Sequence, residues 1–425
     1  MRGRLNRLIL PFVLAAACAM CSLNAAAQFV YLDDNNGTVG GNTATGFSLV
    51  GPSLSLIAGS PFATFGTGLG KFFAPVQEVA ISYGGSLQTC LFVSDPLASS
   101  GFPNGDIAAF TVNTSTGALT YVGSFDDPTN TSGSNFYGIS LAVDRRVGFP
   151  YLFAGFSGES KIAFYKVDPN TCKIFWASST PAVGISGVPA QGIAVSKAGP
   201  HILAVSYGDG SIQSFKVGGG TLIPKPLFAS TGFGSQGGMP QGVDITKNGA
   251  FVVFGDNQPG AGEVEVAPVM TGGALGATLD FGGPANAGGV VMTGLNSQNV
   301  WLSPGFISAK NYLYVTNNYS NQITTLRLDP ITGLVSNTSP CSGVYTNPTT
   351  LTPGVWNFPA QLHTMVNTAS GGGLAVVEYG TPSSVALVQV QNPTGCTKEV
   401  PTSPFIDPNS NHGLFSLDVF PSRPY

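Results

Sequence analysis

The sequence predicts an all-β fold, a seven-bladed β-propeller of four-stranded blades whose ring is closed by a C-terminal strand that completes the N-terminal blade. Three observations predict it. Short apolar runs alternate with turn residues, one strand motif recurs in seven places, and the two ends of the chain supply complementary strands of one blade. The 57 Gly and 31 Pro among the 425 residues favour turns over helices.

The strand motif is clearest at residues 311–335. An apolar run at 312–315, an Asn/Ser turn and an alternating run at 323–328 indicate short strands joined by tight turns. Because a lone meander of this kind cannot bury its apolar faces, copies of it must stack on one another. Further copies of the apolar run lie at 30–32, 91–93, 152–154, 203–205, 252–254 and 374–376.

A nearly constant spacing links the copies. The residues that end the second strand of each blade lie 61, 61, 51, 49, 61 and 61 positions apart, and they are Asp34, Asp95, Phe156, Tyr207, Asp256, Asn317 and Glu378. The first strand of the propeller, at 29–32, is a second strand of the motif, whereas the last, at 415–420, is an inner strand without partners. Pairing these two strands closes the ring and removes long exposed edges.

The first 27 residues have the features of a secretory signal peptide. A basic start with three arginines is followed by an apolar stretch at 8–18 and by three alanines, 25–27, of the kind that precede cleavage. We therefore predict a signal peptide at 1–27 and a single propeller domain at 28–425, secreted or periplasmic. A lipoprotein anchor at Cys18 is the less favoured alternative, since Leu14 lies one place too far upstream.

The charge balance narrows the class of partner. Removing residues 1–27 takes three arginines and no acidic residue, so 14 basic and 21 acidic residues remain and the formal net charge falls from −4 to −7. Nucleic acid is therefore an unsuitable partner. Charged residues make up only 9% of the chain, and no later apolar stretch reaches the roughly 20 residues that cross a bilayer.

Four cysteines remain after the signal peptide, and an oxidising compartment allows three pairings among them. Cys90 begins a second strand and Cys172 lies at the start of a fourth strand in the adjacent blade, so these two can pair. Cys341 and Cys396 are then left, in adjacent blades but at opposite strand ends. The spacing matches no zinc pattern.

Residues Tyr314-Val315-Thr316-Asn317 form a literal YVTN signature. With the repeat around it, the chain resembles the YVTN and lactonase-like seven-bladed β-propellers, a group that includes 6-phosphogluconolactonase-type and muconate-cycloisomerase-type enzymes. The likeness spans nearly all of residues 29–420. It implies the propeller fold and, in the enzymatic relatives, a His/Arg/Glu constellation that is not recognisable in this sequence.

Glutamines recur where the inner strand of the blade begins, close to the expected mouth of the axial channel. The candidate ligand-binding residues are Gln77, Gln191, Gln241, Gln298 and Gln361, with Tyr137 in the equivalent place of the third blade and Trp356 in an aromatic rim. A ring of amides suits a polar ligand such as a carbohydrate or a peptide. The structural alternative is that each amide satisfies backbone groups, a need that recurs by symmetry.

Acidic residues recur at the end of the second strand. Asp34, Asp95, Asp256 and Glu378 together can hold a hard cation such as Ca²⁺ or serve as acid and base in ring opening. The structural alternative is that these short side chains open the strand-to-strand turn by bonding their own backbone. The prediction for cofactors is therefore none, or Ca²⁺.

Two hypotheses of function follow. The first is a binding or interaction module for a polar ligand or a protein partner at the channel mouth, because the scaffold is regular and catalytic motifs are scarce. The second is a lactonase-like hydrolase or isomerase that uses Glu378 and His412 as catalytic residues. No arginine falls at a channel-facing repeat position, which argues against phosphorylated substrates in particular.

Overall fold

The structure is a computed structural model of the whole chain. It describes residues 28–70, 78–82, 88–130, 135, 138–144, 146, 150–158, 161–181, 190–207, 209–229, 240–258, 261–279, 290–294, 297–302, 311–317, 322–336, 344–346, 358–367, 371–379, 383–391, 396–407 and 416–420. The predicted signal peptide, residues 1–27, lies outside these ranges. Every element within them is a β-strand.

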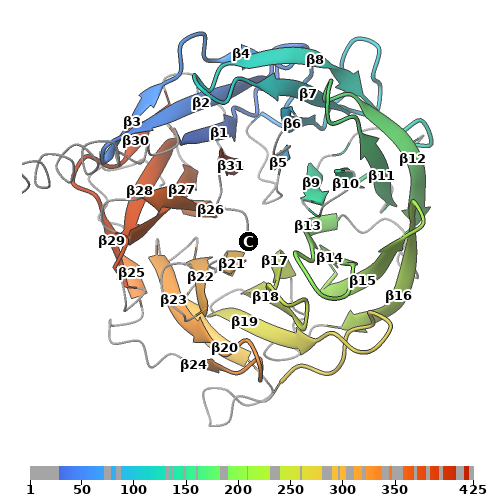
Figure 1. Cartoon of the computed structure of the whole chain (residues 1–425), viewed down its shortest axis with the longest axis vertical. Coiled ribbons are helices and arrows are strands. Elements are labelled where there is room, and N and C mark those ends of the chain that lie inside the picture. The colour runs from blue at the N-terminus through green and yellow to red at the C-terminus, as the bar shows by residue number, and fades with distance from the viewer. Residues whose placement is uncertain are drawn as a thin grey trace, which may run out of the picture.

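The described strands form seven antiparallel sheets, which surround a central axis (Figure 1). We number the sheets in chain order and give their strands from the inside outward. Sheet 1 is built from β31 (Leu417–Phe420), β1 (Phe29–Asp33), β2 (Thr43–Val50) and β3 (Ser53–Leu56), with β4 (Phe62–Ala63) also on β2. Sheet 2 is built from β5 (Val79–Ser82), β6 (Thr89–Asp95), β7 (Asp106–Val112) and β8 (Leu119–Phe125). Sheet 3 is built from β9 (Ile139–Asp144), β10 (Tyr151–Phe156), β11 (Lys161–Val167) and β12 (Ile174–Pro181).

The remaining sheets follow the same order. Sheet 4 is built from β13 (Ala190–Val195), β14 (Ile202–Tyr207), β15 (Ser211–Gly218) and β16 (Thr221–Ala229). Sheet 5 is built from β17 (Pro240–Ile245), β18 (Phe251–Gln258), β19 (Ala261–Pro268) and β20 (Val290–Gly294). Sheet 6 is built from β21 (Ser297–Leu302), β22 (Asn311–Asn317), β23 (Gln322–Leu328) and β24 (Val335–Ser336), with β25 (Val344–Thr346) also on β23. Sheet 7 is built from β26 (Phe358–Asn367), β27 (Gly371–Tyr379), β28 (Ser384–Val390) and β29 (Thr397–Glu399), with β30 (Phe405–Ile406) also on β28.

The all-β propeller prediction is confirmed, and so is the repeat register. Four of the second strands, β6, β10, β14 and β22, end at the predicted residue. The other three, β1, β18 and β27, end within two residues of it. The innermost strands of neighbouring sheets contact one another in ring order, from β31 through β5, β9, β13, β17, β21 and β26 back to β31.

Strand alternation divides the core into layers between sheets. On β1, Phe29 and Tyr31 pack with side chains of sheet 2, while Val30 and Leu32 pack with sheet 7. Because successive side chains of a strand point to opposite faces, each sheet gives one row of apolar residues to each neighbour. A stack of such sheets is buried on both faces only when the ring closes.

Ring closure uses the C-terminal strand, as predicted. β31 pairs with β1 from Phe29↔Phe420 to Leu32↔Leu417. It also contacts sheet 2, because the Asp418 carboxylate accepts a hydrogen bond from the Ile81 amide at 2.9 Å. The hydroxyl of Ser416 accepts the amides of Glu78 and Val79 at 2.8 and 3.0 Å. The first and the last described strands therefore meet in sheet 1 (Figure 1).

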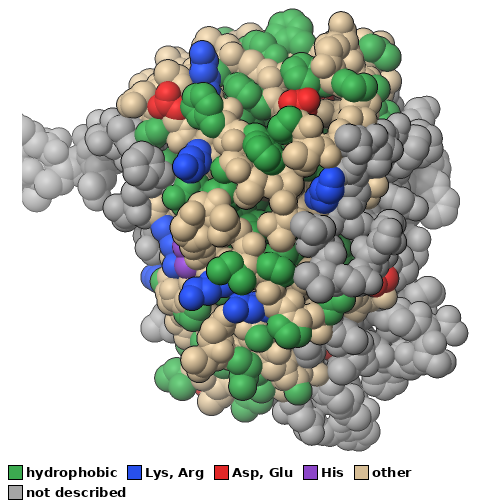
Figure 2. Space-filling model, turned by 90° about the vertical axis from the view of Figure 1, so that its right-hand side faces the viewer, with side chains coloured by type: hydrophobic (Ala, Val, Ile, Leu, Met, Phe, Trp, Pro, Cys, Tyr) green, Lys and Arg blue, Asp and Glu red, His purple; other side chains and the backbone are tan. Residues whose placement is uncertain are grey.

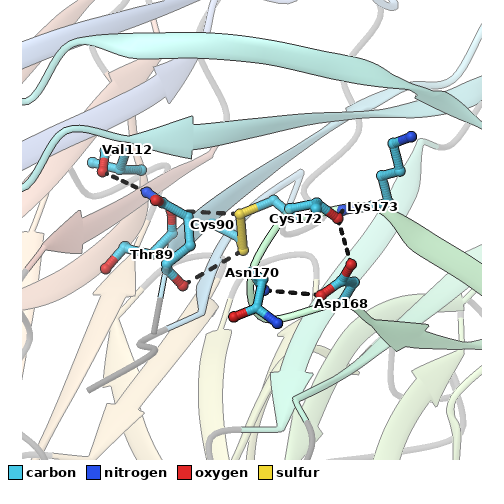
Figure 3. Close-up of a disulfide and its surroundings, with 9 residues drawn as sticks. Thr89, Cys90, Val112, Asp168, Asn170, Cys172 and Lys173 are labelled. Carbon is cyan, nitrogen blue, oxygen red and sulfur yellow. Dashed lines mark hydrogen bonds between the residues drawn. A yellow bond between two sulfur atoms is a disulfide. The ribbon is translucent and has the colours of Figure 1, made fainter. Parts of the chain in front are cut away.

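A disulfide links sheets 2 and 3. Cys90 on β6 is bonded to Cys172, which lies in the turn before β12, across 82 positions of sequence (Figure 3). The pairing predicted for these two cysteines is confirmed, and a disulfide is typical of an oxidising compartment. Cys396 is also disulfide-bonded, whereas Cys341 lies outside the described residues. Within the described ranges, no helix is long and apolar enough to cross a membrane.

Candidate functional site

The innermost strands of sheets 4 to 7 share one irregularity. In each, the pairing with the second strand shifts at the beginning of the inner strand, which marks a β-bulge. The shifts lie at 190–193, 240–243, 297–299 and 359–362, and they contain Gln191, Gln241, Gln298 and Gln361 respectively. A bulge leaves its extra residue unpaired and can redirect a side chain. The recurrence of glutamine therefore coincides with a recurrent break in the ladder.

Gln191 is the member of this set whose side chain is described. It is 5% exposed, and its Oε1 atom receives no hydrogen bond from the described chain. The next residue, Gly192, donates its amide to the Ser206 hydroxyl at 2.8 Å. The backbone next to Gln191 is thus fixed by a hydrogen bond, while its side-chain amide oxygen remains available as an acceptor.

The other predicted ligand residues are placed less completely. Gln241, Gln298 and Gln361 are placed only by their strands, β17, β21 and β26. Gln77, Tyr137 and Trp356 lie outside the described residues, so their predicted roles stay predictions. The bulges lie beside the ends of the second strands, as in the pairs Ala190↔Tyr207 and Ser297↔Asn317.

The predicted acidic set lies between sheets. Asp34, Asp95 and Glu378 follow the alternation of their strands, so each faces the preceding sheet, as the apolar residues two and four positions earlier do. Asp34 therefore lies between sheets 7 and 1, Asp95 between sheets 1 and 2, and Glu378 between sheets 6 and 7. The structure does not bring these three side chains together. Asp256 is placed by its strand β18 alone.

Asp34 is buried against sheet 7. Its carboxylate accepts the hydroxyl of Thr43 and, at 2.9 Å, that of Thr45. Burial, and then the nearby Asp407 carboxyl, raise the pKa of Asp34 well above its usual range. The group therefore favours its protonated form, as expected for two acids in one apolar interface.

Glu378 has a similar environment without an adjacent aspartate. Ser384 donates its hydroxyl to Glu378 Oε2 at 2.7 Å, and Oε1 receives no hydrogen bond from the described chain. Burial raises the pKa of Glu378 to about 7, although the Ser384 bond lowers it. A group with such a pKa can exchange a proton at neutral pH. Its proposed catalytic partner His412 lies outside the described residues.

Asp95 belongs to a cluster that also contains Asp33 of β1. The Asn42 side-chain amide donates to Asp33 Oδ1 at 2.9 Å and to Asp95 Oδ1 at 2.8 Å, so it bridges sheets 1 and 2. Thr64 donates its hydroxyl to the same Asp95 oxygen at 2.8 Å. Gly66 packs on the Asp95 carboxyl so closely that a Cβ atom there would lie 2.1 Å from Asp95 Cγ. The cluster is therefore enclosed and admits no larger residue at position 66.

Two further acids complete this group, which we call the carboxyl cluster: Asp33, Glu78, Asp95 and Asp106. Asp106 pairs directly with Asp95 across strands β6 and β7, and Glu78 precedes the inner strand β5. All four side chains are fully buried. Of these four residues, only Asp95 belongs to the predicted acidic set, and Asp33 is adjacent to its member Asp34. Strand alternation could have found Asp33, since it shares its face with Tyr31, which packs on sheet 2.

Acids at the other end of the sheets have basic residues as neighbours. Asp144 at the end of β9 contacts His201 at 2.6 Å, and its Oδ1 accepts the Arg146 amide at 3.0 Å. The Arg146 guanidinium also donates to the Ser196 carbonyl at 2.8 Å, which ties sheet 3 to sheet 4. Lys197 and Asp244 form an ion pair at 3.2 Å between sheets 4 and 5.

The positions and free oxygens of these acids decide whether they can hold a metal ion. Among the described residues, no group of three or more His, Cys, Asp or Glu side chains is arranged to hold a metal ion. Asp34, Asp95 and Glu378 each have one oxygen that receives no hydrogen bond from the described chain, which is the chemistry that Ca²⁺ prefers. Because they lie in three separate interfaces, they do not fit a single shared ion.

The face seen in Figure 2 is largely uncharged, with charged side chains scattered over it.

No family model matches this chain, and no curated protein matches it. Among solved structures it is similar to a Bacteroides uniformis protein provisionally named 6-phosphogluconolactonase, with 12% identity, 93% of this chain and 99% of that chain covered, and a TM-score of 0.57. It is also similar to a protein of unknown function from Desulfotomaculum acetoxidans, with 12% identity, 91% and 98% coverage, and a TM-score of 0.58. At this identity the likeness supports the propeller fold alone.

Proposed function

We propose that this chain is an exported, seven-bladed propeller that binds a neutral polar ligand, a carbohydrate or a peptide, or a protein partner at the mouth of its channel. Each of the seven sheets is then one blade. The observation that carries the proposal is the bulge that recurs in four inner strands, each time with a glutamine. The Cys90–Cys172 disulfide supports export.

The bulges suit recognition of an uncharged ligand. Inner strands of neighbouring sheets are adjacent, so equivalent bulges lie around one axis. A glutamine amide offers two donors and an acceptor, and the free Gln191 Oε1 is such an acceptor. The acids described above lie between sheets and are enclosed, which supports binding over chemistry at these positions.

The test is binding of the purified protein to glycan and peptide arrays, followed by the variants Gln191→Ala and Trp356→Ala. We expect each variant to weaken binding of an array hit by about ten-fold, the usual effect of losing one buried polar or aromatic contact. The matched control is Gln389→Ala, the same chemical change on β28, a third strand away from the axis. Unchanged binding in both test variants would refute the proposed surface.

The second candidate function is a lactonase-like hydrolase or isomerase. The observation in its favour is the fold likeness to the Bacteroides uniformis protein, together with the near-neutral pKa of Glu378. In this reading Glu378 and His412 exchange protons with a lactone. A Ca²⁺ ion, if one were bound, would be held by single members of the predicted acidic set and would supply Lewis-acid chemistry. Glu378 is 1% exposed, so substrate must enter between sheets 6 and 7 to reach it.

A panel of unphosphorylated lactones tests this second candidate. We expect Glu378→Gln and His412→Ala each to lower hydrolysis at least a hundred-fold if these residues are the acid and base. Equal hydrolysis by the variants and the parent would exclude the assignment. Metal content and chelator-dependent melting of the same preparation test the Ca²⁺ proposal independently of activity.

A further inference from the structure

The carboxyl cluster between sheets 1 and 2 has more acceptors than donors. Asn42 and Thr64 donate to Asp33 and Asp95, and Ser99 donates to Asp106 at 3.0 Å. Five carboxyl oxygens receive no hydrogen bond from any donor of the described chain, and they are Asp33 Oδ2, Glu78 Oε1, Glu78 Oε2, Asp95 Oδ2 and Asp106 Oδ1. An isolated buried carboxylate is very unfavourable, so these oxygens need a neutralising partner.

Glu78 independently indicates that the cluster needs a neutralising partner. It comes from sheet 2, ahead of β5, is fully buried, and neither of its oxygens meets a donor N–H or O–H group of the described chain. The nearby Asp33 and Asp95 carboxyls raise the pKa of Glu78 beyond the effect of burial. Buried carboxyls that share an interface without a cation favour a state in which at least one of them holds a proton.

The elements around the cluster supply no cation among the described residues. The electrostatic neighbours of its members are the acidic Asp126 and the phenol Tyr121, beside Asp106, together with the members themselves. Asp34 lies on the opposite face of its strand, against sheet 7. A bound proton is therefore the neutralising species that the described contacts leave available.

We propose that sheets 1 and 2 are joined by proton sharing within the carboxyl cluster, which makes this joint of the propeller sensitive to pH. The cluster holds protons while the two sheets are packed together and loses them when they separate. Asn42, which bridges Asp33 and Asp95, fixes the two carboxyls at the distance that makes sharing necessary. The joint strengthens in mild acid and weakens as the pH rises.

The pKa values agree in direction. Burial raises the pKa of Asp33 to about 7 and that of Asp106 to about 6. Burial, and then the neighbouring carboxyls, raise the pKa values of Glu78 and Asp95 well above their usual range. A carboxyl whose pKa is higher in the folded state contributes stability that is complete below its unfolded pKa of roughly 4 and is lost as pH rises through the folded value.

The first experiment counts protons on the unmodified mature protein. Unfolding by guanidinium at pH 7 in weak buffer should release protons, because the buried acids ionise on exposure. The melting temperature should also fall by roughly 3 °C or more between pH 5 and pH 8. A pH-independent melting temperature with no proton release would refute the proposal without any variant.

Variants assign the protons to this cluster. Glu78→Gln and Asp33→Asn should each flatten the dependence of melting temperature on pH, and Glu78→Gln should lower the proton release by about one. The matched control is Asp329→Asn in an exposed turn, whose pKa is lowered by turn hydrogen bonds and which should leave the slope between pH 5 and pH 8 unchanged. An equal slope in the Glu78→Gln variant and the parent would refute the assignment, even if Asp33→Asn failed to fold.

A metal-binding experiment distinguishes bound protons from a bound cation. Melting curves at pH 8 with EDTA and with added Ca²⁺ should coincide if protons neutralise the cluster. A chelator-sensitive melting temperature that becomes insensitive in Glu78→Gln, with no proton release on unfolding, would show that a cation fills the cluster and would overturn the proposal.

Discussion

Two interfaces of this propeller bury acids in opposite ways. Between sheets 3 and 4, Asp144 has a histidine and an arginine as partners, and the guanidinium goes on to bond the neighbouring turn. Between sheets 1 and 2, four carboxyls face one another with an asparagine and hydroxyls as donors. Basic side chains surround the first acid, whereas the second group has only other acids as ionisable neighbours, and burial raises their pKa values. The same repeat geometry therefore gives interfaces that should respond differently to mutation.

Neutralising the paired acid should have the largest effect. We expect Asp144→Asn to lower the free energy of unfolding by about 2 kcal/mol, since Asp144 is buried, contacts His201 at 2.6 Å and accepts the Arg146 amide. Guanidinium unfolding at matched pH measures this. His201→Gln should cause a smaller loss, because the imidazole is partly exposed. If Asp144→Asn left the free energy of unfolding unchanged, the contrast between the two interfaces would be refuted.

Neutralising a member of the carboxyl cluster should act in the opposite direction. At pH 8 we expect Glu78→Gln to raise the free energy of unfolding by about 1 kcal/mol, because the folded state no longer holds a buried acid against ionisation. At pH 5 the same variant should differ little from the parent. If the variant were less stable than the parent at both pH values, packing of the Glu78 side chain, and not its proton, would stabilise the contact between sheets 1 and 2.

An effect of the same size as that of Glu78→Gln, but destabilising, is expected between sheets 4 and 5. Lys197→Met removes the cation from the ion pair with Asp244, whose side chain is 5% exposed. We expect a loss of about 1 kcal/mol, between the values for exposed and for fully buried pairs. Chemical unfolding in low and in high salt checks this, because salt weakens the attraction between Lys197 and Asp244 in the parent, whereas the variant has no such attraction to lose.

The sequence was sufficient for most of the fold because the repeat is strict. The spacing of Asp95, Phe156 and Tyr207 placed the ends of three second strands, and the unpartnered run ending at Phe420 predicted ring closure. The pairing of Cys90 with Cys172 followed from their positions in adjacent blades. Each of these rests on local pattern and connectivity, which a sequence records directly.

The carboxyl cluster was harder to predict, because it depends on which face of its strand each side chain occupies and on contacts between sheets. Asp34 and Asp95 occupy one repeat position in the sequence, which predicts that both lie near the channel mouth. In the structure the neighbour of Asp95 is Asp33, one residue earlier and on the other face of β1 from Asp34. Glu78 and Asp106 come from different strands, and nothing in their local sequence indicates that they meet.

The closing strand has a consequence for biogenesis. Sheet 1 receives its innermost strand from residues 417–420, which are synthesised after every other described strand. Until then, the Ile81 and Glu78 amides lack the acceptors that Asp418 and Ser416 provide. The order of synthesis therefore delays closure of the ring until all the other described strands have been made.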